Sequence, residues 1–205
     1  MVAPSSRGSM SRVLPSPLRR ATAVMLLLTG LLYAVEVVDS LSGERLARAG
    51  GIVPRTVDGL DGVLLAPVLH GPWPHLLGNT VPFAVLGFLA LAGGVRQFVL
   101  VTALIWLGSG AAVWLTAGAG TYTVGASGVI FGWLAFLLVR GFFARSPRQV
   151  LLAVVLFAVW GGILLGVLPG QAGVSWQGHL FGALFGVLAA WLVARADRPA
   201  VRSGA

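Results

Sequence analysis

One serine between glycines and one histidine ahead of a glycine-rich run are the residues of this chain best suited to chemistry. The serine stands in Gly125-Ala126-Ser127-Gly128 and the histidine in Gly178-His179, each at the start of a long apolar segment. A serine hydroxyl is a weak nucleophile until a neighbouring base takes its proton. We therefore expect Ser127 and His179 to meet as a nucleophile and its general base.

Glycines recur at intervals of four residues on both apolar segments. Gly128 and Gly132 mark the first segment, and Gly178, Gly182 and Gly186 mark the second. Small residues at this spacing allow membrane helices to pack closely, which a short Ser–His hydrogen bond requires. Gly125 and Gly128 also remove side-chain bulk beside Ser127, so that a substrate backbone can approach.

The predicted start of a helix at Ser127 favours an anion. The backbone N–H groups of a first helical turn have no partner within the helix, and the positive end of the helix attracts negative charge. A tetrahedral oxyanion is such a charge. Farther upstream, His75 and Asn79 are four residues apart and share one helix face, where both can donate hydrogen bonds. A polar pair that only ties two helices together is the alternative for these two residues.

Composition places these residues in a membrane. The chain is 57% hydrophobic and 10% charged, with a mean hydropathy of +0.92, whereas about a quarter of a soluble domain is charged. Six apolar runs approach the roughly 20 residues that a membrane-spanning helix needs. They are 21–38, 75–91, 97–116, 126–143, 150–168 and 179–193.

The predicted fold is therefore an all-α bundle of six membrane spans within residues 21–194. Residues 1–20, rich in Ser, Pro and Arg, should be a disordered cytoplasmic tail, and residues 195–205 a second cytoplasmic tail. A signal peptide is the alternative for the first run, because basic residues precede it. Glu36 and Asp39 lie at the outer end of that run, where we expect solvated carboxylates.

The arginines predict the orientation. All 14 basic residues are arginines, and eleven of them fall on one side of the six-span arrangement. The excess of positive charge marks the cytoplasmic side, so we expect both termini in the cytoplasm of a cell-membrane protein. The second, fourth and sixth spans then begin at the outer face, which places His75, Ser127 and His179 at a similar depth. Because the arginines flank apolar runs, they are a topology signal, and no nucleic-acid partner is expected.

Three motifs, in this order, resemble those of the rhomboid intramembrane serine proteases. The segment from His70 through His75 to Asn79 resembles the first, Gly125-Ala126-Ser127-Gly128 the serine motif, and His179 with Gly182 and Gly186 the histidine helix. The resemblance implies a Ser–His dyad that cleaves transmembrane substrate proteins near the outer membrane surface, without a cofactor. It also implies that His75 and Asn79 bind the oxyanion, and that His70 has a supporting role.

The dyad should lack a third, acidic member, because no carboxylate stands within the spans near His179. Packing must then orient the imidazole. Phe131, one helical turn after Ser127, is the neighbour expected to stack on His179, although ordinary core packing is its alternative. Some family members carry Tyr at this position, so a hydrogen bond from that hydroxyl is not available to Phe131.

The sequence lacks the residues that several other catalytic mechanisms need. There is no Cys and no Lys, and neither an HExxH zinc motif nor a phosphate-binding GxxxxGK[ST] loop is present. No metal site is expected. Two alternatives to a protease stay open. One is a catalytically inactive rhomboid-like protein that binds membrane proteins, because the first loop lacks a Trp-Arg pair found in many relatives. The other is a small transporter, which would favour polar residues at mid-membrane depth in several spans.

Overall fold

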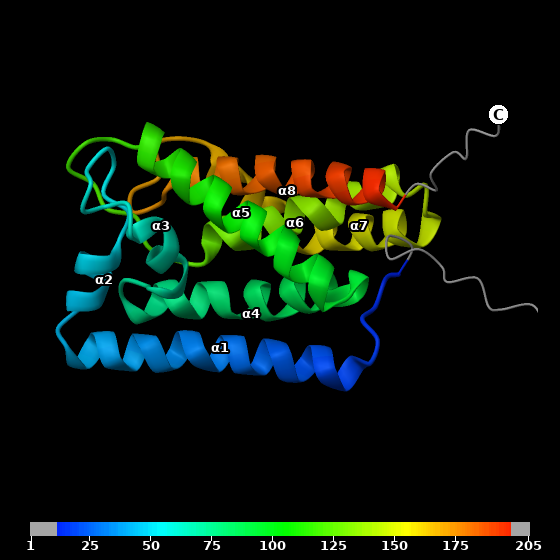
Figure 1. Cartoon of the computed structure of the whole chain (residues 1–205), viewed down its shortest axis with the longest axis horizontal. Coiled ribbons are helices and arrows are strands. Elements are labelled where there is room, and N and C mark those ends of the chain that lie inside the picture. Colours follow the sequence, from blue (N-terminus) through cyan, green and yellow to red (C-terminus); the bar gives the residue numbers. More distant parts are fainter. Residues whose placement is uncertain (1–11, 198–205) are drawn as a thin grey trace, which may run out of the picture.

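Long apolar segments form six main helices that run side by side along one axis (Figure 1). The structure is a computed structural model and describes residues 12–197. The main helices are α1 (Leu18–Leu41), α4 (Trp73–Ala90), α5 (Val95–Thr116), α6 (Ser127–Phe143), α7 (Pro147–Trp160) and α8 (Trp176–Ala196). Within the described residues there is no strand, only an isolated bridge between Ile52 and Thr123, and the predicted all-α membrane bundle is confirmed.

Five helical segments are long and apolar enough to cross a membrane, and α6, with 17 residues, is a shorter apolar helix. The start of α1 and the end of α8 lie at the same end of the molecule (Figure 1). We call this the terminal end, and we call the opposite end, with residues 42–72, 117–126 and 168–175, the loop end. An even number of passes along the axis produces this arrangement.

The helix boundaries differ from the expected spans by a few residues. Helix α1 begins at Leu18, inside the segment expected to be a tail, and α8 continues to Ala196. The fifth span changes from α-helix to the 3₁₀ helix η4 at Gly161–Val167. The remainder of the two predicted tails, residues 1–11 and 198–205, lies outside the described residues.

Helix α6 forms the centre of the bundle. Eleven of its residues are buried, from Val129 to Gly141, as expected for a helix that is apolar on all sides. It packs against α4, α5, α7 and α8. Because α6 is enclosed by other helices, the residues at its start are surrounded by protein on several sides.

The long loop between α1 and α4 folds over the loop end. It contains α2 (Arg45–Gly50), α3 (Gly62–Leu65) and the 3₁₀ helix η2 (Ala66–Val68). Side chains fasten it to α5: the Arg55 guanidinium donates to the carbonyls of Leu115 and Ala117, at 3.0 and 2.7 Å. Trp106 Nε1–H donates to the Val63 carbonyl at 3.0 Å. The loop is therefore a fixed part of the bundle.

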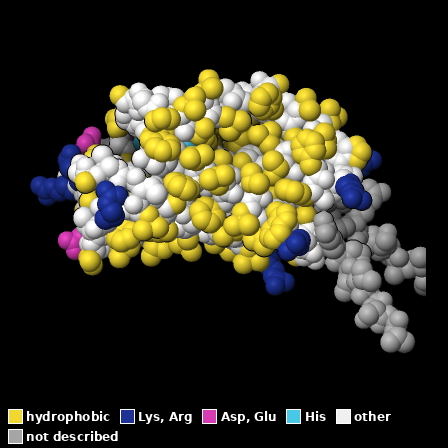
Figure 2. Space-filling model, turned by 90° about the horizontal axis from the view of Figure 1, so that it is seen from above, with side chains coloured by type: hydrophobic (Ala, Val, Ile, Leu, Met, Phe, Trp, Pro, Cys, Tyr) yellow, Lys and Arg dark blue, Asp and Glu magenta, His cyan; other side chains and the backbone are white. Residues whose placement is uncertain are grey.

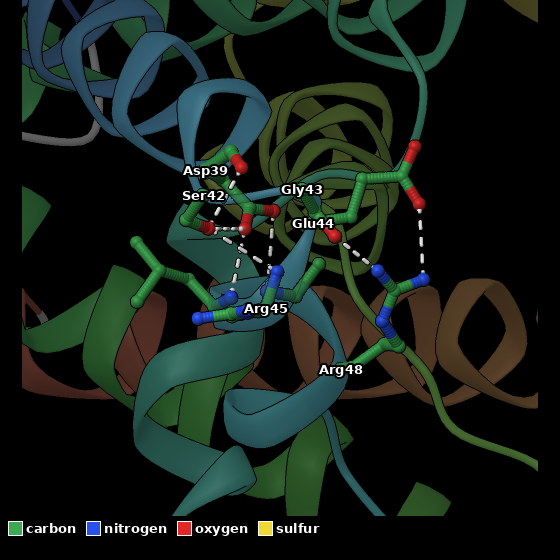
Figure 3. A network of polar contacts seen from close by, with 8 residues as sticks. Asp39, Ser42, Gly43, Glu44, Arg45 and Arg48 are labelled. Carbon is green, nitrogen blue, oxygen red and sulfur yellow. Dashed lines mark hydrogen bonds and ion pairs between the residues drawn. The ribbon is translucent and has the colours of Figure 1, made fainter.

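The acidic end of α1 corrects the expectation of solvated carboxylates. Asp39 is 2% exposed, and its oxygens accept the backbone N–H groups of Leu46 and Ala47 at 2.7 and 3.2 Å (Figure 3). These N–H groups belong to the first turn of α2, which has no capping side chain from its own N-cap residue. Asp39 therefore caps α2 from a neighbouring helix. Glu36 is also buried, at 3% exposed.

The terminal end holds a buried arginine. Arg140 is fully buried; its Nε donates to Gln149 Oε1 at 2.9 Å, and its Nη2 donates to the Arg12 carbonyl. Gln149 Nε2 donates to the same carbonyl at 2.7 Å. The segment ahead of α1 is thus held against the start of α7.

The surface matches a membrane position. In the view of Figure 2, apolar side chains cover the middle of the molecule, basic side chains gather at both ends, and acidic ones appear only at the loop end. A molecule with an apolar belt and charged ends fits the hydrocarbon core and the two polar interfaces of a bilayer. The protein is a multi-pass membrane protein.

Candidate active site

Ser127 is the first residue of α6, and the chain enters it through a sharp bend at Gly125. Gly125 has φ +116°, in the region that favours glycine, and a Cβ there would meet the ring of His75. The Gly125 N–H donates to the Ala66 carbonyl at 2.8 Å. No side chain caps α6 at Ala126, so the N–H groups of the first turn beside Ser127 remain available.

His179 is the fourth residue of α8 and contacts Ser127 directly. The helix begins after Ser175, whose hydroxyl accepts the Gly178 N–H at 3.3 Å. His179 Nε2 lies 2.9 Å from Ser127 Oγ. The structure therefore brings together the two residues expected to form the dyad.

A backbone carbonyl fixes the tautomer of His179. Its Nδ1 lies 3.0 Å from the Gly166 carbonyl oxygen. A carbonyl oxygen only accepts, so Nδ1 must carry the proton. In the neutral imidazole, Nε2 then has a free lone pair, and the hydrogen bond runs from the Ser127 hydroxyl to Nε2. This is the arrangement that a general base needs.

Gly166 belongs to η4 and is a site residue that we did not predict from the sequence. A Cβ at this position would lie 2.9 Å from His179 Nδ1 and 3.1 Å from the Phe131 ring. Only glycine brings its carbonyl this close without a shift in the rings. A backbone acceptor leaves little trace in a sequence, and the glycine itself is the one signal that could have indicated it.

Phe131 covers the other side of the imidazole. Its ring centroid lies 3.9 Å from that of His179, and the planes differ by 8°, so the rings are stacked. Both the stacking and the Gly166 carbonyl hold the imidazole in place. The expectation that packing alone orients His179 is therefore incomplete.

The glycine faces of α6 and α8 meet. A Cβ at Gly182 would collide with the Gly128 carbonyl, and one at Gly186 would collide with the Gly132 carbonyl. A Cβ at Gly128 would lie 3.2 Å from the Gly178 carbonyl oxygen. The two backbones are in direct contact through these positions, which places Ser127 and His179 at hydrogen-bonding distance.

His75 and Asn79 lie on α4 and face the same space as the dyad. A cavity of about 730 Å³ is lined by His75, Asn79, Ser127 and His179. Asn79 is 9% exposed, and its Nδ2 has no hydrogen-bond partner among the described residues. A buried donor without a partner costs free energy, which favours a hydrogen bond from the Asn79 amide to a ligand oxygen in this cavity.

His70 lies behind this cavity, outside its lining. It is 1% exposed, its ring centroid is 5.2 Å from that of His75, and its Nε2 accepts the Ala126 N–H at 3.4 Å. Burial, and to a smaller extent the charge of a nearby His75, lowers the pKa of His70 to about 4. The neutral ring thus connects the end of the first loop to the residue before Ser127.

The cavity reaches the loop end of the bundle. Its lining includes residues of three loops, among them Gly71, Gly118 and Gly173. A Cβ at Gly128 would lie 3.5 Å from Ser109 Oγ. Ser109 is seven residues before the end of α5, so the first turn of α6 lies beside a point roughly 10 Å from that helix end.

The fold and the site define a helical membrane protein in which a serine and a histidine are hydrogen-bonded and line one cavity. A family model described as Rhomboid domain matches residues 60–196. The chain belongs to the rhomboid family, and the resemblance noted in its motifs is confirmed.

Relatives extend across most of the chain. An uncharacterized protein of Mycobacterium tuberculosis (strain ATCC 25618 / H37Rv) is 50% identical over 184 residues, covering 86% of this chain and 76% of that protein. One of Mycobacterium leprae (strain TN) is 47% identical over 176 residues, covering 82% and 69%. A rhomboid-named protein of Acanthamoeba polyphaga mimivirus is 30% identical over 129 residues, covering 60% and 69%.

Proposed function

We propose that this protein is an intramembrane serine endopeptidase that cleaves transmembrane substrate proteins with a Ser127–His179 dyad. The observation that carries the proposal is the hydrogen-bonded chain from Ser127 Oγ through the imidazole to the Gly166 carbonyl, at 2.9 and 3.0 Å. This chain contains a nucleophile, a base with its lone pair toward the nucleophile, and a group that orients the base.

The first half of the reaction forms an acyl-enzyme. Ser127 Oγ attacks the scissile carbonyl while its proton moves to His179 Nε2, and the imidazolium keeps its Nδ1–H on the Gly166 carbonyl. The tetrahedral oxyanion accepts hydrogen bonds from Asn79 Nδ2, from His75 and from N–H groups of the first turn of α6. His179 then gives its proton to the leaving amine, and the peptide bond breaks.

The second half releases the product. Water entering through the loop end gives a proton to His179 Nε2 and attacks the acyl ester. The second tetrahedral intermediate collapses, the new carboxyl terminus leaves, and the proton returns to Ser127 Oγ. A water-accessible cavity in a membrane protein is compatible with the polar backbone and side chains that line this one.

The position of the cavity indicates which part of a substrate can be cleaved. The first turn of α6 lies roughly 10 Å from the end of α5, so the scissile bond must come from a segment at or within the membrane. A helical substrate hides its carbonyls, and local unwinding must precede attack. We propose residence in the cell membrane with both termini in the cytoplasm, so that the cavity opens on the outer side.

The experiment uses the purified full chain and a single-span test substrate in vesicles. Ser127→Ala, His179→Ala and the double variant should all reduce cleavage to the same near-background rate, because members of one catalytic unit are not additive. A fluorophosphonate should label the wild type at Ser127, and labelling should fall sharply in His179→Ala. Ser109→Ala, a buried serine on α5, is the matched control and should keep its activity.

Two outcomes would overturn the proposal. Normal cleavage by Ser127→Ala would exclude this serine as the nucleophile. A wild-type protein that binds the substrate without cutting it, and resists the fluorophosphonate, would instead be the inactive rhomboid-like protein.

A further inference from the structure

A second hollow lies on another face of α6, away from the dyad. It is a groove of about 420 Å³ whose walls are α1 and α5 and whose floor is α4 and α6. Leu31, Phe83 and Ala103 are among its lining residues. Its polar side-chain atoms are already engaged: Trp133 Nε1–H donates to Thr102 Oγ1 at 3.0 Å, and Trp106 is bonded to the first loop. The groove therefore suits an apolar ligand.

The groove opens sideways to the surroundings of the bundle. Leu31 on one wall is 50% exposed and Val99 on the other is 54% exposed. In a multi-pass membrane protein, side chains exposed at this depth face hydrocarbon. Since the rim is apolar and open, lipid chains have direct access.

The groove has the depth of one leaflet. On α5 it extends from Phe98 to Leu107, which lie two and eleven residues beyond Arg96. At about 1.5 Å per residue, this places its ends roughly 3 and 16 Å from Arg96. Half of a hydrocarbon core about 30 Å thick is about 15 Å. The loop residues Pro67 and Val68 close the far end.

Two arginines precede the groove toward the terminal end, one on each wall. Arg96 precedes Val99, Ala103 and Leu107 at helical spacing on one wall, and Arg20 precedes Leu28 and Leu31 on the other. Both side chains are exposed, and neither has an ion pair within the described residues. An anionic group at this end would find two unpaired cations.

The length of the groove suits an acyl chain. Its lining on α5, from Phe98 to Leu107, covers roughly 14 Å, which is about the depth of one leaflet, whereas a membrane-spanning helix needs about 30 Å. The length and the apolar lining therefore favour an acyl chain as the occupant.

We propose that this groove is a specific site for an anionic phospholipid of the leaflet at the terminal end. One acyl chain lies between α1 and α5, and the phosphate lies between Arg20 and Arg96. The end of the acyl chain reaches Val68 and Ala126. Val68 lies two residues before His70, and Ala126 is the residue at the start of α6 that His70 contacts. The bound lipid therefore supports the loop and the helix start behind Ser127. The proposal depends on the membrane position of the bundle and not on proteolysis.

The test uses the full chain in phosphatidylcholine vesicles containing phosphatidylglycerol with a diazirine halfway along one acyl chain. After illumination, labelled residues are mapped by mass spectrometry. We expect labels on the groove-facing residues of α1 and α5, and competition by unlabelled phosphatidylglycerol but not by phosphatidylcholine. Labels on the exposed face of α7 should show no such preference and report ordinary lipid contact.

Two pairs of variants separate the site from its surroundings. Arg20→Gln with Arg96→Gln should weaken the preference for phosphatidylglycerol by about fivefold for each arginine, whereas Arg19→Gln with Arg148→Gln should change it little. Ala103→Phe should remove the groove labels, and Ala111→Phe, on the exposed side of α5, should leave them.

Three results would overturn the proposal. They are equal competition by both lipids, groove labels no stronger than those on α7, and displacement of the lipid by a transmembrane substrate peptide. If Ala103→Phe does not fold, the competition experiment on the wild type and the arginine variants decide the question.

Discussion

The unused amide of Asn79 is the most informative single group at the residue scale. Its Nδ2 is buried without a partner in the described part of the chain, and Asn79 and Ser127 line the same cavity. If it binds the oxyanion, it acts only in the transition state. Asn79→Ala should then lower kcat by about two to three orders of magnitude and leave KM nearly unchanged. Steady-state cleavage assays measure both constants, and an unchanged kcat would remove Asn79 from the oxyanion site.

His70 predicts a pH dependence of stability. Its pKa is about 4 in the folded protein, below the usual value of about 6.5. Between these values the unfolded chain binds a proton that the folded protein does not, so stability is complete above about pH 6.5 and is lost as the pH falls toward 4. Between pH 8 and pH 5 this loss is about 2 kcal/mol.

Thermal unfolding in detergent at these two pH values measures the effect. His70→Gln, which cannot titrate, should lose less stability on acidification than the wild type does. An equal loss in both proteins would show that His70 does not hold a depressed pKa in the fold.

Residue types predicted the contact between Ser127 and His179 but not all of its environment. Ser127 and His179 were accessible from the sequence because their chemistry is carried by side chains and their neighbours are glycines. The role of the Gly166 carbonyl could not be predicted from the sequence. Every residue has a carbonyl, and only the path of the chain determines where it lies. The burial of Asp39 was missed for a similar reason: its partners are backbone N–H groups of a short helix that the apolar pattern does not reveal.

At the scale of elements, the contact between α6 and α8 controls the site. Gly182→Val would place a branched side chain against the Gly128 carbonyl, and the helices must separate. Overpacking of this kind costs about 1–3 kcal/mol, and the Ser–His distance increases with it. We expect a lower unfolding temperature and a loss of fluorophosphonate labelling at Ser127.

Gly30→Val is the matched control, because nothing lies within 4 Å of a Cβ at Gly30 on α1. This variant should keep both its labelling and its unfolding temperature. Loss of labelling in both variants would indicate a general effect of glycine replacement and not the contact between α6 and α8.

The six helices were predictable to within a few residues because a membrane requires long apolar segments. The change from α7 to the 3₁₀ helix η4 at Gly161 could not be predicted, because both helix types satisfy the same apolar pattern. They differ in one hydrogen-bonding step along the backbone. Yet that change occurs in the segment whose Gly166 carbonyl meets His179, so the least predictable stretch of the span is the one that contacts the site.

At the scale of the whole molecule, charge predicts orientation. The arginines concentrate at the terminal end, whereas the three at the loop end are accompanied by acidic residues. Both termini should therefore be cytoplasmic. Reporter fusions that are active on only one side of the membrane, placed at each terminus and in the loop near Gly120, measure this. A terminus that reports from the outer side would contradict the proposed orientation.

His179 Nδ1 contacts the Gly166 carbonyl and not a carboxylate, and this difference affects the charge of the site. A carboxylate beside the imidazole would be a permanent ion within the bilayer, where isolated charges are costly. The Gly166 carbonyl is a dipole and carries no formal charge. With a neutral imidazole and an un-ionised serine, the dyad is uncharged before the reaction begins. In the proposed reaction, positive and negative charge arise together, as imidazolium and oxyanion a few ångströms apart, and disappear together when each intermediate collapses.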